Sequence, residues 1–184
     1  RIGQKLEIIK LKAFLEKIGI LSKINFDIEE VGEPIPFKWG KCKLATVSFG
    51  HGITTTPLQL AKAYAIISNG GFAVEPSLIK SELKNNQQKK RIIKAGISEK
   101  INPILRKIVT TKEGTAGLVN IEGYEVGGKT GTAQKTIVGG YSKAKVNTFA
   151  GIFPASNPKY VLIVLLDEPK TSSDYVYEYK NKKG

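Results

Sequence analysis

The chain has 184 residues, a net charge of +13 at pH 7, 41% hydrophobic residues and 24% charged residues. This length and balance are typical of one globular domain and argue against a disordered chain. Cys42 is the only cysteine and His51 the only histidine, so an intramolecular disulfide is excluded and a structural zinc site lacks ligands. The longest apolar run, residues 160–166, is too short to span a bilayer.

The positive charge has two interpretations. Either the composition is simply rich in lysine, or the chain is attracted to an anionic partner such as lipid headgroups, cell-wall polymers or nucleic acid. The lysines are scattered, with the densest cluster at residues 88–91, and no zinc-finger spacing or aromatic RNA-binding pattern accompanies them. We therefore expect no nucleic acid among the partners.

Hydrophobic spacing predicts two helices in the first part of the chain. Residues 2–18 carry apolar side chains at helical intervals. The second helix has the clearest start, because Thr56 suits the N-cap, Pro57 suits the first turn and Gln59 completes a capping box. We expect this helix to end at the Asn-Gly-Gly sequence of residues 69–71.

The middle of the chain is less regular. Residues 25–39 predict a loop, and residues 72–83 predict a strand that enters a polar hairpin at residues 84–90. A third helix is predicted to begin near Ser98, with Pro103 in or near its first turns.

Strand patterns replace helical ones after residue 117. Residues 122–134, 146–153 and 160–166 predict three strands, the last of them buried, and short connections favour antiparallel pairing. The polar, lysine-rich residues 171–184 predict a poorly ordered tail. The fold class is therefore α/β (α+β), with helices followed by a three-stranded antiparallel meander.

The Lys129-Thr130-Gly131 tripeptide lies on the first predicted strand, and its surroundings make it specific. The strand sequence around it, residues 123–134, resembles class B penicillin-binding proteins, and so do residues 49–61, 113–116 and 149–158 with 161–169, in the same order and at similar spacing. The likeness runs over about residues 1–170 and is greater to the septal, cell-division branch. It implies that residues 1–184 are the C-terminal portion of a transpeptidase domain with the penicillin-binding/β-lactamase-like fold, truncated at both ends.

The resemblance also implies roles for these residues. Lys129 and Thr130 would hold the carboxylate of a peptidoglycan stem peptide ending in D-Ala-D-Ala, or that of a β-lactam. Gly131 would let the backbone approach the ligand, and the Thr132 N–H would be one donor of the oxyanion hole. Cell-division proteins are implied as further partners, and no metal or organic cofactor is implied. The implied location is the extracytoplasmic (periplasmic) face of the cytoplasmic membrane, reached through an N-terminal anchor that this chain lacks.

The resemblance is incomplete at the nucleophile. No Ser-x-Asn motif occurs, and we expect it, like the nucleophile motif, to precede Arg1. The Ser-x-x-Lys strings that begin at Ser77, Ser81 and Ser142 fit chance occurrence in a lysine-rich chain. We therefore expect the chain alone to be inactive. A non-catalytic remnant of a split transpeptidase gene is the alternative.

Two other active-site hypotheses come from short patterns. Residues 123–130 match the nucleotide-binding P-loop pattern, which requires a helix beginning at Lys129, although the residues that follow lack a helical stripe. Ser48 and His51, oriented by Asp174 or Glu168, could form a nucleophile and base, but a wall position for His51 is favoured. Cys42 is expected to be a small buried hydrophobe.

Overall fold

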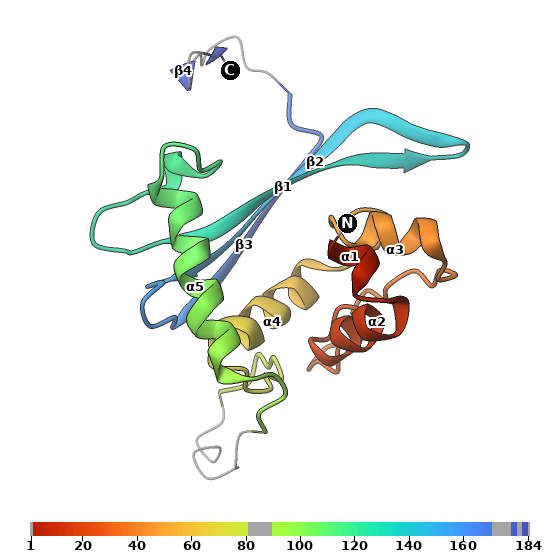
Figure 1. Ribbon diagram of the computed structural model, residues 1–184, viewed down its shortest axis with the longest axis horizontal. Helices are drawn as coiled ribbons and strands as arrows, with labels where there is room; N and C mark the ends of the chain where they lie inside the picture. Colours follow the sequence, from red (N-terminus) through yellow and green to blue (C-terminus); the bar gives the residue numbers. More distant parts are fainter. Residues whose placement is uncertain (1, 81–89, 171–177, 180–181, 184) are drawn as a thin grey trace.

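The computed structural model describes residues 2–80, 90–170, 178–179 and 182–183. Helices come first and a three-stranded sheet follows, as the sequence predicts, and the α4 and α5 helices lie beside the sheet (Figure 1). No helix of the described residues is long and apolar enough to cross a membrane.

The N-terminal helix predicted over residues 2–18 is instead two helices, α1 (Ile2–Lys5) and α2 (Ile8–Lys17). The break falls at Glu7, whose φ of 61° lies in the left-handed region. The break lets α1 pack against α3 (Lys41–Val47), a helix that the sequence analysis missed. This packing is close, since a Cβ on Gly3 would lie 2.1 Å from the Cβ of Ser48.

The α4 helix (Pro57–Ser68) confirms the predicted capping box. The Gln59 N–H donates to Thr56 Oγ1 at 3.1 Å, and the Thr56 N–H donates to Gln59 Oε1 at 2.8 Å. The Gln59 side chain is fully buried, and its amide also donates to the Ser22 carbonyl at 2.6 Å. The capping box therefore also ties the start of α4 to the loop after α2.

The α5 helix (Ala95–Thr110) begins three residues before the predicted start, and Pro103 lies in its middle. Ser98 does not cap this helix, because its hydroxyl accepts from the Gly70 N–H and donates to the Ile67 carbonyl. A short 3-10 helix, η2 (Gly117–Val119), follows.

The prediction of a strand over residues 72–83 is wrong for residues 72–80, which are the part of this segment that the structure describes. Only an isolated bridge joins Phe72 to Arg91, and residues 73–80 are irregular. Residues 81–89, which include most of the predicted hairpin, lie outside the described residues. The poor alternation of residues 72–83 accounts for the error, because no face of this segment is apolar enough to pair on a sheet.

The sheet confirms the predicted meander. Strands β1 (Gly127–Ile137), β2 (Gly140–Phe153) and β3 (Tyr160–Asp167) are antiparallel, in the order β1-β2-β3. The first strand starts five residues later than predicted, at Gly127 rather than residue 122. The predicted tail, residues 171–184, lies outside the described residues apart from the two-residue strands β4 (Glu178–Tyr179) and β5 (Lys182–Lys183).

The prediction that residues 160–166 are buried is wrong. β3 forms one edge of the sheet among the described residues, and its alternate side chains are exposed on the face away from the helices: Tyr160, Leu162, Val164 and Leu166. The opposite face supplies the core residues Ala150 and Ile152, which are 3% and 0% exposed. Another core cluster joins the end of α2 to α4 through Ile18, Ile20, Ala63, Ile66 and Ile93.

Candidate active site

A groove of about 640 Å³ lies between the sheet and α4 with the loop before it, on the sheet face that carries Ala150. Residues 129–133 of β1 form one wall, and residues 49–50 and 53–57 with Leu60 and Tyr64 form the other. Strand register brings Gly131 opposite Thr148 and Ala133 opposite Val146, so these four residues line one stretch of the groove. The burial of Tyr64 in this wall raises the pKa of its hydroxyl above the ordinary value.

Lys129 and Thr130 place hydrogen-bond donors together on β1, which forms the other edge of the sheet. Lys129 Nζ lies 2.5 Å from the Thr130 carbonyl oxygen and 3.4 Å from Thr130 Oγ1. Thr130 Oγ1 lies 2.8 Å from Thr115 Oγ1. One ammonium group and two hydroxyl groups therefore meet at this edge, an arrangement that suits an anionic ligand.

Thr115 is a site residue that the sequence analysis missed. Residues 113–116 were recognised as a loop of the family, but nothing in the sequence says that the loop folds back onto β1. The turn needs Gly114, because a Cβ there would lie 2.0 Å from the carbonyl oxygen of Ile108. The loop therefore passes directly against the end of α5 before it presents Thr115 to Thr130.

Two glycines of β1 have different surroundings. A Cβ on Gly128 would lie 2.4 Å from Phe149 Cζ and 2.6 Å from the Ala150 carbonyl oxygen, so packing within the chain excludes a side chain there. A Cβ on Gly131 would lie no closer than 3.8 Å to Thr148, an ordinary contact. The fold itself therefore has room for a side chain at Gly131, and the open space there is available to a ligand. The neighbouring Thr132 is exposed and pairs with Asn147.

The far end of the same strand is held by ion pairs. Lys135 Nζ contacts Asp167 at 2.8 Å and Glu168 at 2.8 Å, and these hydrogen bonds, Asp167 first, raise the pKa of Lys135. They join β1 to the end of β3 across the sheet.

The structure contradicts the P-loop hypothesis. Residues 127–137 form β1, so a strand stands where a phosphate-binding helix would have to begin at Lys129. The Ser48–His51 hypothesis also lacks its geometry. The Ser48 hydroxyl donates to the Ala45 carbonyl at 2.7 Å, and the His51 ring packs 4.9 Å from the Tyr141 ring.

The prediction of a buried Cys42 is wrong, since Cys42 is exposed at the start of α3. An isolated cysteine gives no periodic signal, and the helix that turns it outward was not predicted. No cluster of His, Cys, Asp and Glu that could hold a metal ion occurs in the part of the chain that the structure describes.

The Ser-x-x-Lys strings do not form a nucleophile site in the described residues. Ser77 lies in an irregular segment and hydrogen bonds to the backbone of Ile79. Ser142 lies in β2 with Lys145, and side chains three residues apart on a strand point to opposite faces. Ser81 lies outside the described residues.

Comparisons with known proteins bear on the family and the fold of the chain. Residues 1–183 match the family model of the penicillin binding protein transpeptidase domain. The "Probable peptidoglycan D,D-transpeptidase PenA" of Neisseria flavescens is 36% identical over 140 residues, which make up 75% of this chain and 34% of the relative. Stage V sporulation protein D of Bacillus subtilis is 33% identical over 183 residues, covering 92% of this chain and 28% of the relative. The chain thus spans about a third or less of these curated relatives.

Solved structures confirm the expected transpeptidase fold. The transpeptidase domain of Burkholderia pseudomallei penicillin-binding protein 3 superposes with a TM-score of 0.84 at 26% identity, covering 91% of this chain and 52% of that one. Penicillin-binding protein 3 of Mycobacterium tuberculosis, solved with ampicillin, gives a TM-score of 0.79 at 28% identity, covering 90% of this chain and 41% of that one.

Proposed function

Because this chain belongs to the penicillin-binding protein transpeptidase family, we propose that it supplies the carboxylate-binding strand of a peptidoglycan D,D-transpeptidase. The Lys129 ammonium and the Thr130 hydroxyl bind the terminal carboxylate of a D-Ala-D-Ala stem peptide. Thr115 orients the Thr130 hydroxyl. The single observation that carries the proposal is the meeting of these three groups at the edge of β1, beside the uncrowded Gly131.

The reaction proposed for the complete enzyme is serine acyl transfer. A serine hydroxyl attacks the penultimate D-Ala carbonyl, the terminal D-Ala leaves with the proton, and an amine of a second stem peptide resolves the ester. The Thr132 N–H donates to the oxyanion that forms during attack, on a strand rigid enough to need no rearrangement. A β-lactam carboxylate binds to the same Lys129 and Thr130.

We propose that the nucleophile lies on a segment outside this chain. The groove beside β1 supports this, because apolar side chains such as Val47, Leu60 and Ile163 line it and leave a surface for a further apolar element. A serine carried on such an element would lie next to Gly131 and Thr132. By resemblance, the complete protein acts at the division septum, on the outer face of the cytoplasmic membrane, with cell-division proteins as partners.

A fluorescent penicillin tests this proposal. The purified 184-residue chain should acquire no covalent label, while a complete transpeptidase that contains the chain should acquire one label on a serine outside it. Labelling of Ser77, Ser81 or Ser142 in the chain alone would place the active site elsewhere. If the complete protein takes no label, the chain is the non-catalytic remnant that the sequence leaves as the alternative.

A further inference from the structure

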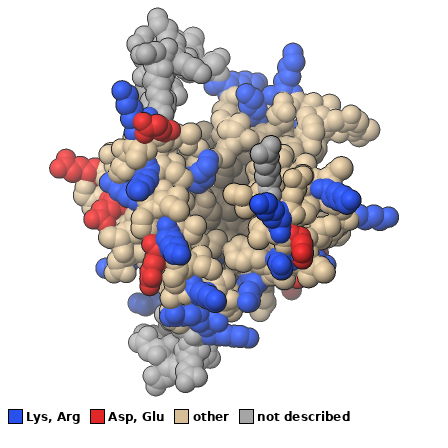
Figure 2. Space-filling model, in the orientation of Figure 1, with Lys and Arg blue, Asp and Glu red and all other residues tan. Residues whose placement is uncertain are grey.

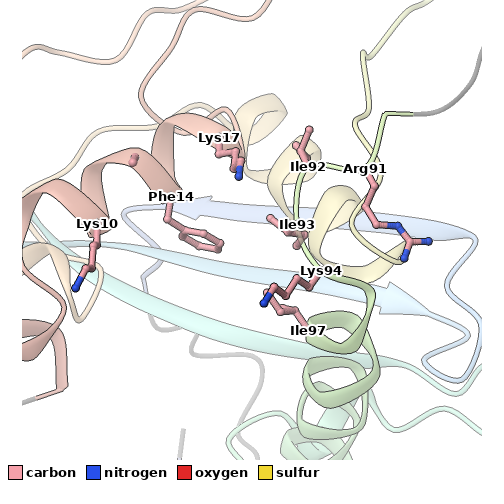
Figure 3. Close-up of a pocket in the computed structure, with 9 residues that line it drawn as sticks. Lys10, Phe14, Lys17, Arg91, Ile92, Ile93, Lys94 and Ile97 are labelled. Atoms are coloured by element: carbon pink, nitrogen blue, oxygen red, sulfur yellow. The ribbon is translucent and has the colours of Figure 1, made fainter.

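A second groove, of about 700 Å³, lies between α2 and the segment that leads into α5. One helical face of α2 forms its first wall with Lys10, Ala13, Phe14 and Lys17, which recur at i, i+3, i+4 and i+7. Residues 91–94 and Ile97 form the second wall. Figure 3 shows Phe14 pointing from α2 toward the second wall, with lysine side chains around the opening.

The floor of this groove is apolar. Phe14 is 37% exposed although it lies in the concave part of the surface, and Ile92 and Ile97 are half-buried beside it. Ile93 beneath them belongs to the core cluster that holds α2 to α4. Ile92, Ile93 and Ile97 of the floor are therefore continuous with the core, and Phe14 extends the apolar surface toward solvent.

The rim of the groove is positively charged. Lys10, Lys17, Arg91 and Lys94 line it, and no carboxylate does so among the described residues. Lys17 and Lys94 form no ion pair with any described residue, and the contact of Lys10 with Glu7 is long, at 3.7 Å, with both side chains 67% exposed. Among the described residues, no carboxylate that lines the groove offsets the charge of Lys17, Arg91 and Lys94.

The start of α5 adds to this positive potential. Lys94 occupies the N-cap position, no side chain caps the helix, and its first turn contains no acidic residue. Because Lys94 lines the groove, the positive end of the 16-residue helix dipole lies at the same rim, while the Glu99 carboxylate, 3.8 Å from a Cβ built on Gly96, does not line the groove. Lysine is unfavourable at this position for the chain by itself, and an acidic ligand would make it favourable.

We propose that this groove binds an acidic amphipathic helix of a partner protein, whose apolar face rests on Phe14, Ile93 and Ile97 while its carboxylates meet Lys10, Lys17 and Lys94. A helix fits better than a lipid surface, because the apolar residues lie between two walls, α2 and residues 91–97, that can each contact one side of a helix. In helix-in-groove recognition the bound helix presents apolar anchors at i, i+3, i+4 and i+7 to an apolar groove, and the apolar floor here suits such anchors. Charge on the rim steers association, and the apolar floor supplies most of the affinity.

The test uses a labelled synthetic helix with leucines at those four positions and glutamates between them, together with a scrambled peptide of the same composition. The intact chain should bind the helix more tightly than the scrambled peptide. Combined Lys10→Glu, Lys17→Glu and Lys94→Glu changes should weaken binding about tenfold or more. The matched control reverses Lys38, Lys100 and Lys159, which are exposed, line no part of this groove and change the net charge equally. Its effect should stay below about threefold.

Phe14→Ala tests the floor without changing charge, and it should weaken binding about tenfold through lost apolar burial. Amide chemical shifts should change around residues 10–17 and 91–97. Equal binding of the scrambled peptide, or equal losses in both triple variants, would overturn the proposal. So would capture of the chain by phosphatidylglycerol vesicles through the same three lysines with no binding of the helix, or loss of the site in a complete transpeptidase.

Discussion

Thr130→Val should slow β-lactam acylation of a complete transpeptidase that contains this chain. The hydroxyl that is lost lies 3.4 Å from Lys129 Nζ and 2.8 Å from Thr115 Oγ1, so it stands between the cation and the loop. A hydrogen bond to a charged group contributes about 1.5–3 kcal/mol, which corresponds to a loss of roughly 10- to 150-fold in acylation rate.

The fold should tolerate this change. Valine has the same branched shape as threonine and suits a strand, and the partner hydroxyl of Thr115 is exposed and can bind water instead. The free energy of unfolding should therefore change by less than about 1 kcal/mol. The assay is the second-order rate of labelling by a fluorescent penicillin, paired with a urea titration of each variant.

Three variants separate the role of the hydroxyl from that of packing. Thr130→Ser should retain most of the acylation rate, because it keeps the donor. Thr115→Val should cost about fivefold, the value of one neutral hydrogen bond. The double variant should be no slower than Thr130→Val alone, because Thr115 acts only through Thr130. Acylation by Thr130→Val within twofold of the unchanged enzyme, or additive losses in the double variant, would refute the assignment.

Two further predictions concern stability. Gln59→Leu should lower the free energy of unfolding by about 1–3 kcal/mol, since the half-buried Thr56 N–H and the Ser22 carbonyl both lose the hydrogen bond to the buried Gln59 amide; a urea midpoint unchanged from that of the starting chain would contradict this. Stability should also fall as the pH rises above about 10, because burial raises the pKa of Tyr64 in the folded chain and the unfolded chain loses that proton first. Tyr64→Phe should make this fall in stability with pH less steep. Hydrogen bonds to Asp167 and Glu168 also raise the pKa of Lys135 in the folded chain, so Lys135→Met should likewise reduce the loss of stability at high pH.

Features with a local cause could be predicted from the sequence. The capping box of Thr56 and Gln59 uses residues three apart, so four consecutive residues are enough to predict the start of α4. The three strands likewise follow from local patterns, among them the apolar run of residues 160–166, and from the short turns between them. The position of Lys129 near the start of a strand needed no knowledge of distant contacts.

Features that depend on distant contacts could not be predicted. Residues 2–18 have one continuous apolar pattern, and only the packing of α1 on α3 explains the break at Glu7. Thr115 reaches the site because Gly114 lets its loop pass closely against the end of α5. Its hydrogen-bond partner on β1, Thr130, lies 15 residues later in the chain. The exposure of β3 follows from its edge position and from the absence of any described element over its outer face.

The net charge of the chain does not by itself locate a binding site. Figure 2 shows lysine and arginine side chains spread over the visible face, with fewer acidic groups among them. Such a distribution raises the general affinity for anions without locating a site. Location comes from the fold, which brings residues 10–17 and 91–97 together around one groove and places Lys129 beside another.

The geometry of β1, the proposed carboxylate-binding strand, depends on residues within this chain. Gly127 lies so close to α5 that a Cβ would approach the Arg106 backbone nitrogen to 3.1 Å. Arg106 in turn donates to the Val126 carbonyl at 2.7 Å and to Asn120 Oδ1 at 3.0 Å, so α5 fixes the backbone just before Lys129. The β2 strand pairs with every residue from Gly127 to Gln134 on the other side. A nucleophile from another segment would therefore meet a carboxylate-binding site that is already formed, and its own placement in the groove would decide whether acylation occurs.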